Sequence, residues 1–257
     1  IEHRSLVNMC YWYKDYNSIA PDERCTKYMG VSFDASIMEV FPCLTSGGRL
    51  YVISEELKLS PKELNEYFLE NQTTLSLLPT QFGESFIESA KHSSLRRVCL
   101  GGDKLVNFKK RDYAVTNNYG PTENTVITTA FEIDDYYSNF PIGKPIANTF
   151  IYILNRDLRL QPPGIPGELC IAGLGLSRGY LKDLKLTAEK FVDNPLSPGE
   201  RMYRTGDLAR WLPNGNIEFL GRMDRQVKIR GFRIEPGEIG SIGLECSSVK
   251  ETAVIAK

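Results

Sequence analysis

Apolar and polar positions in the first half of the chain alternate between two kinds of spacing. Segments with helical spacing, such as PKELNEYFLEN (61–71) and SFIESAKH (85–92), are each followed by a short apolar run. The two runs are TTLSLLPT (73–80) and LRRVCLGG (95–102). This alternation predicts an α/β layer in which helices connect parallel strands. Because parallel sheets bind ligands at the carboxyl ends of their strands, we expect the loops after these strands to form a site.

The pattern changes to short β-rich runs from about residue 140 onward. Gly and Pro turns separate these runs, which are TFIYILN, GELCIAG, NIEFLGR and QVKIRGFRI. Between LARWL and IEFLGR lies PNGN, where Asn214 and Gly215 predict a β-hairpin with a type I′ turn. The sequence therefore predicts a β-rich part that follows the α/β part.

Composition limits the class of protein. The chain has 257 residues, 42% of them hydrophobic, and a formal net charge of −1, so it carries no overall attraction for nucleic acid or an anionic membrane. No apolar run approaches the roughly 18 residues of a membrane-spanning helix. The six cysteines form no C-x-x-C pair, which argues against a zinc site or a disulfide framework. We expect a cytoplasmic protein that binds neither nucleic acid nor membrane.

Two carboxylates stand beside tight turns. In NNYGPTENT, Glu123 follows a Gly-Pro pair, and the alternative to a functional role is an ordinary surface turn. In SFDASIMEVF, Ser36 and Glu39 fit a capping box, which would leave Asp34 free at the start of a helix. Asp34 is then either an exposed residue that favours the helix dipole or a buried carboxylate that requires a cation.

Three further stretches are ambiguous when each is taken alone. GELCIAGLGLSRGY lacks the G-x-G-x-x-G spacing of a dinucleotide site, because Gly179 lies one residue too late. In YRTGDLARW, Asp207 is typical of an ordinary Asx-turn. The basic run GRMDRQVKIRGFRIEPGEIG has the pattern of a solvated strand face and lacks the interleaved aromatic residues of a nucleic-acid platform.

The order of five stretches changes this interpretation. FDAS, NNYGPTE, GELCIAGLGLSRGY, YRTGDLARW and GRMDRQVKIRGFRIEPGEI resemble the consecutive core motifs of adenylation domains in nonribosomal peptide synthetases. The resemblance covers nearly the whole chain and points to the adenylate-forming superfamily. It implies a parallel-sheet α/β subdomain at 1–135, then a small distorted β-barrel-like subdomain at 136–223. The hinge and the start of the small C-terminal subdomain would follow at 224–257.

The resemblance implies roles in binding ATP and Mg²⁺. Tyr119 would stack on the adenine beside Asn117, and Thr122 would bind phosphate or adenylate oxygens. Glu123 would hold the metal ion, which prefers hard oxygen ligands. Asp207 would accept both ribose hydroxyl groups through its carboxylate. Two cations, Arg222 and Lys228, would lie near the ribose and phosphate.

The resemblance also implies an amino-acid pocket. Asp34 would pair with the α-ammonium group of the substrate, and Phe33 would gate the tunnel for an incoming thiol. Asp224 would be the hinge between the two half-reactions. The remaining lining has no charge and one amide, which favours a medium aliphatic side chain, with leucine first and then isoleucine, methionine or valine. This lining is Ala35, Met38, Leu77, Cys99, Gly101, Asn118, Val126 and Ile127.

The implied reaction is attack by an amino-acid carboxylate on the α-phosphate of ATP, followed by transfer to the phosphopantetheine thiol of a carrier domain. A condensation domain in the same synthetase is a further expected partner. An acyl-CoA ligase is the alternative within the superfamily, and a non-catalytic nucleotide- or partner-binding module is the alternative from another class. Because the family's phosphate loop would precede Ile1 and its catalytic lysine would follow Lys257, we expect a fragment that is inactive alone.

Overall fold

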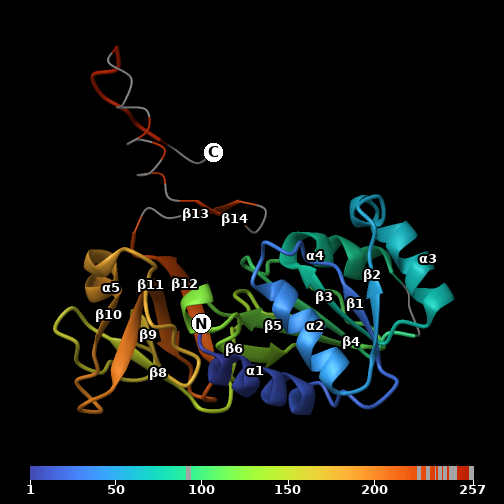
Figure 1. Ribbon diagram of the computed structural model, residues 1–257, viewed down its shortest axis with the longest axis horizontal. Helices are drawn as coiled ribbons and strands as arrows, with labels where there is room; N and C mark the ends of the chain where they lie inside the picture. The colour runs from blue at the N-terminus through green and yellow to red at the C-terminus, as the bar shows by residue number, and fades with distance from the viewer. Residues whose placement is uncertain are drawn as a thin grey trace.

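The structure is a computed structural model in which two parts lie side by side (Figure 1). The first part is a sheet with helices packed on it, and the second part is built on a second sheet. Among the described residues, no helix is both long and apolar enough to cross a bilayer. The side chains of 227–229, 232 and 233 lie outside the description. The described residues are 1–90, 94–224, 227–229, 232–234, 236, 239, 242 and 248–254.

The first sheet has seven strands. They are β1 (Arg24–Lys27), β2 (Arg49–Val52), β3 (Leu75–Pro79), β4 (Arg97–Gly101), β5 (Ala114–Tyr119), β6 (Thr129–Glu132) and β7 (Lys144–Pro145). Their order is β2-β1-β3-β4-β5-β6-β7. The first five strands in this order are parallel, whereas β6 and β7 each run antiparallel to their neighbours. The predicted α/β layer is therefore confirmed.

Helices cover both faces of this sheet, so its central strands are apolar on both sides. Leu77 and Leu78 follow each other in β3 and therefore point to opposite faces. Leu77 packs in a cluster with Met38 of one helix layer, and Leu78 packs in a second cluster with Phe68 of the other. The helices are α1 (His3–Tyr16) and α2 (Ala35–Thr45) on one face, and α3 (Pro61–Asn71) and α4 (Thr80–Ser89) on the other.

The capping box predicted for α2 is wrong. The N-cap residue is Asp34, and no side chain caps the helix. Glu39 instead accepts hydrogen bonds from the backbone N–H groups of Tyr28 and Met29. Ser36 and Glu39 have the spacing of a capping box. Glu39 bonds the loop instead, because buried backbone N–H groups require an acceptor, whereas the N–H groups at an exposed helix end can bond to water.

The second sheet is antiparallel and curls into a half-barrel, which confirms the expected fold class (Figure 1). Its elements are β8 (Thr149–Leu154), β9 (Gly167–Gly173), α5 (Leu184–Lys190), β10 (Phe191–Asp193), β11 (Arg201–Trp211) and β12 (Ile217–Arg222). The strand order is β10-β11-β9-β8, with β12 paired to β11. Ile153, Leu169 and Tyr203 form part of its buried core.

The strand β11 is irregular where it approaches the first sheet. Its register with β9 and with β12 shifts next to Leu208. Gly206 has φ of 74°, and a Cβ there would lie 2.9 Å from Nη2 of Arg222 and 2.9 Å from Oδ2 of Asp224. The backbone angle therefore favours glycine, and a larger side chain would have to displace the ends of Arg222 and Asp224. The irregularity sets the position of the next residue, Asp207.

The predicted hairpin joins β11 to β12, but its turn is not type I′. The N–H group of Gly215 donates to the carbonyl oxygen of Leu212, so Pro213 and Asn214 are the central residues. A type I′ turn needs positive φ at both central residues, and of this loop Gly215 alone has it, at 77°. The loop is a three-residue connection closed by a left-handed glycine. The ring of Pro213, which fixes its own φ near −65°, favours this geometry.

A separate antiparallel ribbon consists of β13 (Val227–Ile229) and β14 (Phe232–Ile234). Figure 1 shows this ribbon standing apart from both sheets. The first sheet ends at Pro145 and the second begins at Thr149. The subdomain boundaries expected from the sequence remain a prediction.

Candidate functional site

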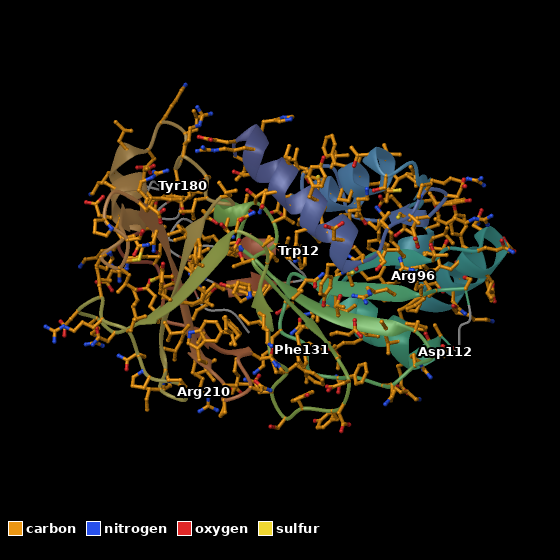
Figure 2. The ribbon with its side chains drawn as sticks, turned by 90° about the horizontal axis from the view of Figure 1, so that it is seen from below. Trp12, Arg96, Asp112, Phe131, Tyr180 and Arg210 are labelled. Atoms are coloured by element: carbon orange, nitrogen blue, oxygen red, sulfur yellow. The ribbon has the colours of Figure 1, made fainter. Side chains whose placement is uncertain are left out.

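A cavity of about 560 Å³ lies where β3, β4 and β5 end. Side chains from the second sheet, including Asp207 and Arg222, close its other side. Arg96 and Asp112 precede β4 and β5, and Figure 2 shows them at the end of the molecule far from Tyr180. The cavity therefore lies at the carboxyl edge of the parallel strands, where the sequence pattern places a ligand site.

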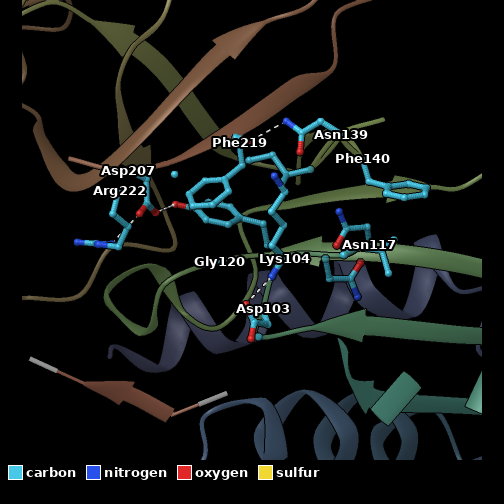
Figure 3. Close-up of a pocket in the computed structure, with 15 residues that line it drawn as sticks. Asp103, Lys104, Asn117, Gly120, Asn139, Phe140, Asp207, Phe219 and Arg222 are labelled. Carbon is cyan, nitrogen blue, oxygen red and sulfur yellow. Dashed lines mark hydrogen bonds and ion pairs between the residues drawn. The ribbon is translucent and has the colours of Figure 1, made fainter. Parts of the chain in front are cut away.

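Four side chains form a continuous network at the border of the two sheets, three of whose members line the cavity. The Tyr119 hydroxyl donates to Oδ2 of Asp207, and Nη1 of Arg222 lies 2.6 Å from Oδ1 of Asp207 (Figure 3). Arg222 also donates to both carboxylate oxygens of Asp224, at 2.7 and 2.6 Å. Asp207 and Arg222 face each other in the β11–β12 ladder. The strand register therefore fixes this ion pair.

The Tyr119 ring is suited to bind a flat ligand. Burial, and then the charge of Asp207, raise the pKa of the Tyr119 phenol well above its usual value of 10. The phenol therefore stays protonated and donates at neutral pH. Its ring lies 6.2 Å from the Phe219 ring. An aromatic face beside a carboxylate can bind a base together with its sugar.

A second cavity of about 280 Å³ adjoins the first along β5 (Figure 3). Lys104 and Asn139 line it together with Asn117, whose Nδ2 donates to the carbonyl oxygen of Pro141 at 2.8 Å. Asn118 lines both cavities. Its buried Oδ1 atom has no hydrogen-bond partner in the part of the chain that the structure describes. Such an acceptor can receive a hydrogen bond from a ligand.

Eight of the nine residues predicted around the amino acid line the larger cavity, and so does Phe33. Cys99 is the exception, because it lies in the buried cluster beneath the cavity, where the Tyr13 hydroxyl donates to its sulfur at 3.5 Å. Cys99 and Gly101 share one face of β4, but Cys99 is two residues further from the carboxyl end. The eight are Asp34, Ala35, Met38, Leu77, Gly101, Asn118, Val126 and Ile127.

Asp34 is joined to a residue 88 positions later in the chain. The Thr122 hydroxyl donates to Oδ2 of Asp34, which connects the start of α2 to the turn η2 (Thr122–Asn124). Both residues also line a third cavity of about 380 Å³. The bond therefore lies between two cavities, and it links two residues for which the sequence implied separate roles.

Glu123 is buried and held by the loop between β9 and α5. Its Oε1 atom accepts a hydrogen bond from the Tyr180 hydroxyl at 2.7 Å. The same turn is held by its backbone, because the Ser177 N–H donates to the Glu123 carbonyl and the Thr125 hydroxyl donates to the Gly175 carbonyl. The sequence patterns did not reveal Tyr180, since an aromatic residue in a glycine-rich loop carries no signal of a partner 57 positions away.

Two contacts that the resemblance implies, from Glu123 to Mg²⁺ and from Lys228 to the nucleotide, stay predictions. Within the described ranges, no three His, Cys, Asp or Glu side chains form a group that could hold a metal ion. Glu123 would therefore give one carboxylate to Mg²⁺, which suits an ion that keeps several waters and is held largely by substrate phosphates. Lys228 lies on β13, and its side chain is outside the description.

Comparison with known proteins identifies the family. A model of the AMP-binding enzyme family matches residues 1–181, and the chain belongs to this family. Over its whole length the chain is 52% identical to bacitracin synthase 1 from Bacillus licheniformis. It is also 50% identical to surfactin synthase subunit 2 from Bacillus subtilis (strain 168). The chain spans 5% and 7% of these two proteins.

Solved structures show the same fold. One is an NRPS protein containing adenylation and PCP domains bound to a vinylsulfonamide inhibitor, with a TM-score of 0.79 and 30% identity over 87% of this chain and 41% of that one. Another is an artificially fused adenylation–PCP di-domain from Klebsiella oxytoca, with a TM-score of 0.83 and 25% identity over 100% of this chain and 50% of that one. The chain is thus part of a nonribosomal peptide synthetase adenylation domain.

Proposed function

We propose that the complete protein activates an amino acid with ATP and transfers it to the phosphopantetheine thiol of a carrier domain. The observation that carries this proposal is the pair of adjoining cavities. The larger cavity has an apolar wall with Asp34 at its edge, and the Tyr119 ring with the pair Asp207 and Arg222 lies where both cavities meet, because these three residues line both. These two environments suit an α-amino acid and a nucleotide.

In the first step, a carboxylate oxygen of the amino acid would bond to the α-phosphorus of ATP, and the bond to the β-phosphate oxygen would break to release pyrophosphate. Asp34 would bind the α-ammonium group, since a cation offsets the cost of a half-buried carboxylate. Tyr119 would stack on the adenine, and Asp207 would accept the ribose hydroxyls. Holding both substrates in one orientation itself lowers the barrier.

Thr122 and Glu123 would act on the phosphate side of the site. The Thr122 hydroxyl would bind a phosphate oxygen. Glu123 would hold Mg²⁺, whose charge offsets that of the phosphates. The hydrogen bond from Tyr180 supports this role, because it fixes the Glu123 carboxylate in one orientation. Arg222 and Lys228 would add positive charge near the ribose and phosphate.

The substrate that fits the larger cavity best is a medium aliphatic amino acid, with leucine first. Met38 and Leu77 give an apolar wall, and Gly101 leaves depth because it has no side chain. One observation favours a second candidate. The unsatisfied Oδ1 of Asn118 could accept a hydrogen bond from an amide side chain, so glutamine or asparagine is the alternative.

The proposed partner is a peptidyl carrier domain, and a condensation domain of the same synthetase in the cytoplasm is a further one. Support comes from the two solved relatives, whose descriptions name PCP domains beside adenylation domains. Phe33 lines the cavity, as a gate for the thiol would. Asp224 lies two residues after the end of β12 and is proposed as the hinge.

The test is amino-acid-dependent exchange of labelled pyrophosphate into ATP by the complete protein, with a panel of the twenty amino acids. Leucine-dependent exchange is expected. Release of pyrophosphate with a fatty or aryl acid and CoA instead would indicate an acyl-CoA ligase. Nucleotide binding by calorimetry without any exchange would indicate a non-catalytic binding module.

A further inference from the structure

Glu39 is a buried carboxylate to which the proposed reaction gives no role. It lies in α2 and is 4% exposed. Its Oε1 accepts from the Tyr28 N–H at 2.8 Å, and its Oε2 accepts from the Met29 N–H at 3.0 Å. The carboxylate therefore holds two consecutive backbone amides of the loop between β1 and α2, which is a strong, charge-assisted arrangement.

The loop needs these acceptors because the sheet cannot supply them. The strand β1 ends at Lys27, where its pairing with β2 ends. On the other side, β1 pairs with β3 only at Cys25. The N–H groups of Tyr28 and Met29 thus lie beyond both ladders. A buried backbone donor without an acceptor lowers the stability of the fold by roughly 1–3 kcal/mol. Glu39 therefore supplies the acceptors that a neighbouring strand would otherwise provide.

Lys27 completes the arrangement from the end of β1. Its Nζ lies 3.4 Å from Oε2 of Glu39 and also donates to the Met29 carbonyl. Met29 is therefore held at both its N–H and its C=O. The other titratable groups facing Glu39 are Tyr13 on α1 and Tyr28, which both sense its charge. Burial raises the pKa of the Glu39 carboxyl to about 7, although the amides and Lys27 oppose this.

The held loop is a wall of the larger cavity. Tyr28, Met29 and Gly30 all line it, on the side next to Met38. Met29 also packs against both buried clusters of the first part. A shift of this loop would therefore change the part of the cavity next to it, whereas Asp207 and Arg222, which also line the cavity, are carried by the second sheet.

We propose that Glu39, with Lys27, is a positioning residue that fixes residues 28–30 as a wall of the amino-acid cavity and so sets the space for the substrate side chain. This inference rests on the proposed function for the identity of the ligand. The contact itself does not depend on that function. Glu39 is a positioning residue because it acts through the loop and does not line the cavity.

The first test measures backbone exchange in the complete protein at pH 8, where Glu39 is ionised. Glu39→Gln keeps the size of the side chain but has one acceptor oxygen and no charge. Hydrogen exchange of a peptide covering residues 24–31 should become about 10- to 100-fold faster, since a hydrogen bond to a charged group is worth about 1.5–3 kcal/mol. Lys27→Met should also make hydrogen exchange of this peptide faster. Glu218→Gln, a buried carboxylate on β12 paired with Arg210, should not.

The second test separates positioning from stability. In pyrophosphate exchange, Glu39→Gln should raise KM for the amino acid about tenfold, a change of about 1.4 kcal/mol, with KM for ATP and kcat nearly unchanged. Unchanged exchange at 24–31 in both variants would overturn the inference, and so would faster exchange with an unchanged amino-acid KM. If the wild-type protein used no amino acid, the proposed function would fail, and the exchange rates would still decide whether Glu39 holds the loop.

Discussion

The two ends of the site are built in different ways. The end that we propose for the nucleotide consists of charged side chains that bind one another, with Arg222 joined to both Asp207 and Asp224. The amino-acid end consists of apolar side chains, such as Met38 and Leu77, that pack on the buried cluster beneath them. Hydrogen bonds fix the first end, whereas packing fixes most of the second, apart from the loop at 28–30 that Glu39 holds.

The two ends should therefore tolerate substitutions to different degrees. Charged partners in a buried network depend on each other, so removal of one leaves the others unsatisfied. A packed apolar wall accepts side chains of similar volume with a smaller cost. Changes at the nucleotide end should therefore have large effects on activity, whereas changes in the apolar wall should alter selectivity by smaller amounts.

The largest effect is expected for Asp207→Asn in the complete protein. Removing one partner of a buried charge pair costs about 2–5 kcal/mol, which is a loss of at least ~30-fold. The measurement is kcat/KM for ATP in pyrophosphate exchange. Asp193→Asn, which changes an exposed aspartate on the neighbouring strand β10, serves as the control. A loss of less than about threefold for Asp207→Asn would show that the network is not part of the nucleotide site.

The next effect concerns stability and pH. The pKa of Glu39 is raised from 4.5 to about 7 by burial, so between these values the folded protein binds more protons than the unfolded chain. Stability due to Glu39 is therefore full below pH 4.5 and is lost as the pH rises through 7. The wild type should lose about 3 kcal/mol more than Glu39→Gln over this interval.

Urea denaturation at a series of pH values measures this difference. Glu70→Gln, at an exposed position of α3, is the control and should reproduce the wild-type profile. Parallel pH profiles for wild type and Glu39→Gln would contradict the assignment of a raised pKa to Glu39.

A smaller effect is expected for Tyr180→Phe, which removes the hydroxyl that donates to Glu123. Loss of a hydrogen bond to a carboxylate should raise the Mg²⁺ concentration for half-maximal exchange by about tenfold. The amino-acid KM should not change. Tyr152→Phe removes a hydroxyl from β8, where it accepts from Asn194, and is the matched control. An equal Mg²⁺ requirement in both variants would remove Tyr180 from the site.

The smallest effect is expected at the apolar end. Met38→Leu conserves volume, so it should change the preference for leucine over valine by less than about tenfold. Met9→Leu is the matched control, because Met9 belongs to the same buried cluster but does not line the larger cavity. A collapse of all activity in Met38→Leu alone would mean that the apolar end is as intolerant as the nucleotide end.

The sequence predicted the features that depend on local pattern. The periodicity predicted an α/β layer with parallel strands, and the turn residues predicted the hairpin from β11 to β12. The predicted type of turn was wrong because PNGN is compatible with two loop lengths. The capping box was wrong because the choice of partner for Glu39 was decided by the loop ahead of the helix.

Contacts between distant segments could not be predicted in this way. The bonds from Tyr180 to Glu123 and from Thr122 to Asp34 join residues 57 and 88 positions apart. Each of these residues is unremarkable in its own segment. Cys99 and Gly101 alternate correctly along β4, but the depth at which the strand meets the cavity is a tertiary property that its sequence does not contain.

The bond between Thr122 and Asp34 has a consequence for competition among substrates. Under the proposed function, an amino acid entering the site must displace or share a donor that Asp34 already has. Its ammonium group can do so, because it adds the attraction of a full positive charge to the hydrogen bond, which a neutral hydroxyl does not. An acid without an amino group offers no donor and leaves the pair closed. The protein would thus discriminate against such acids because they cannot replace the Thr122 hydroxyl as the donor to Asp34. No steric barrier against them is needed.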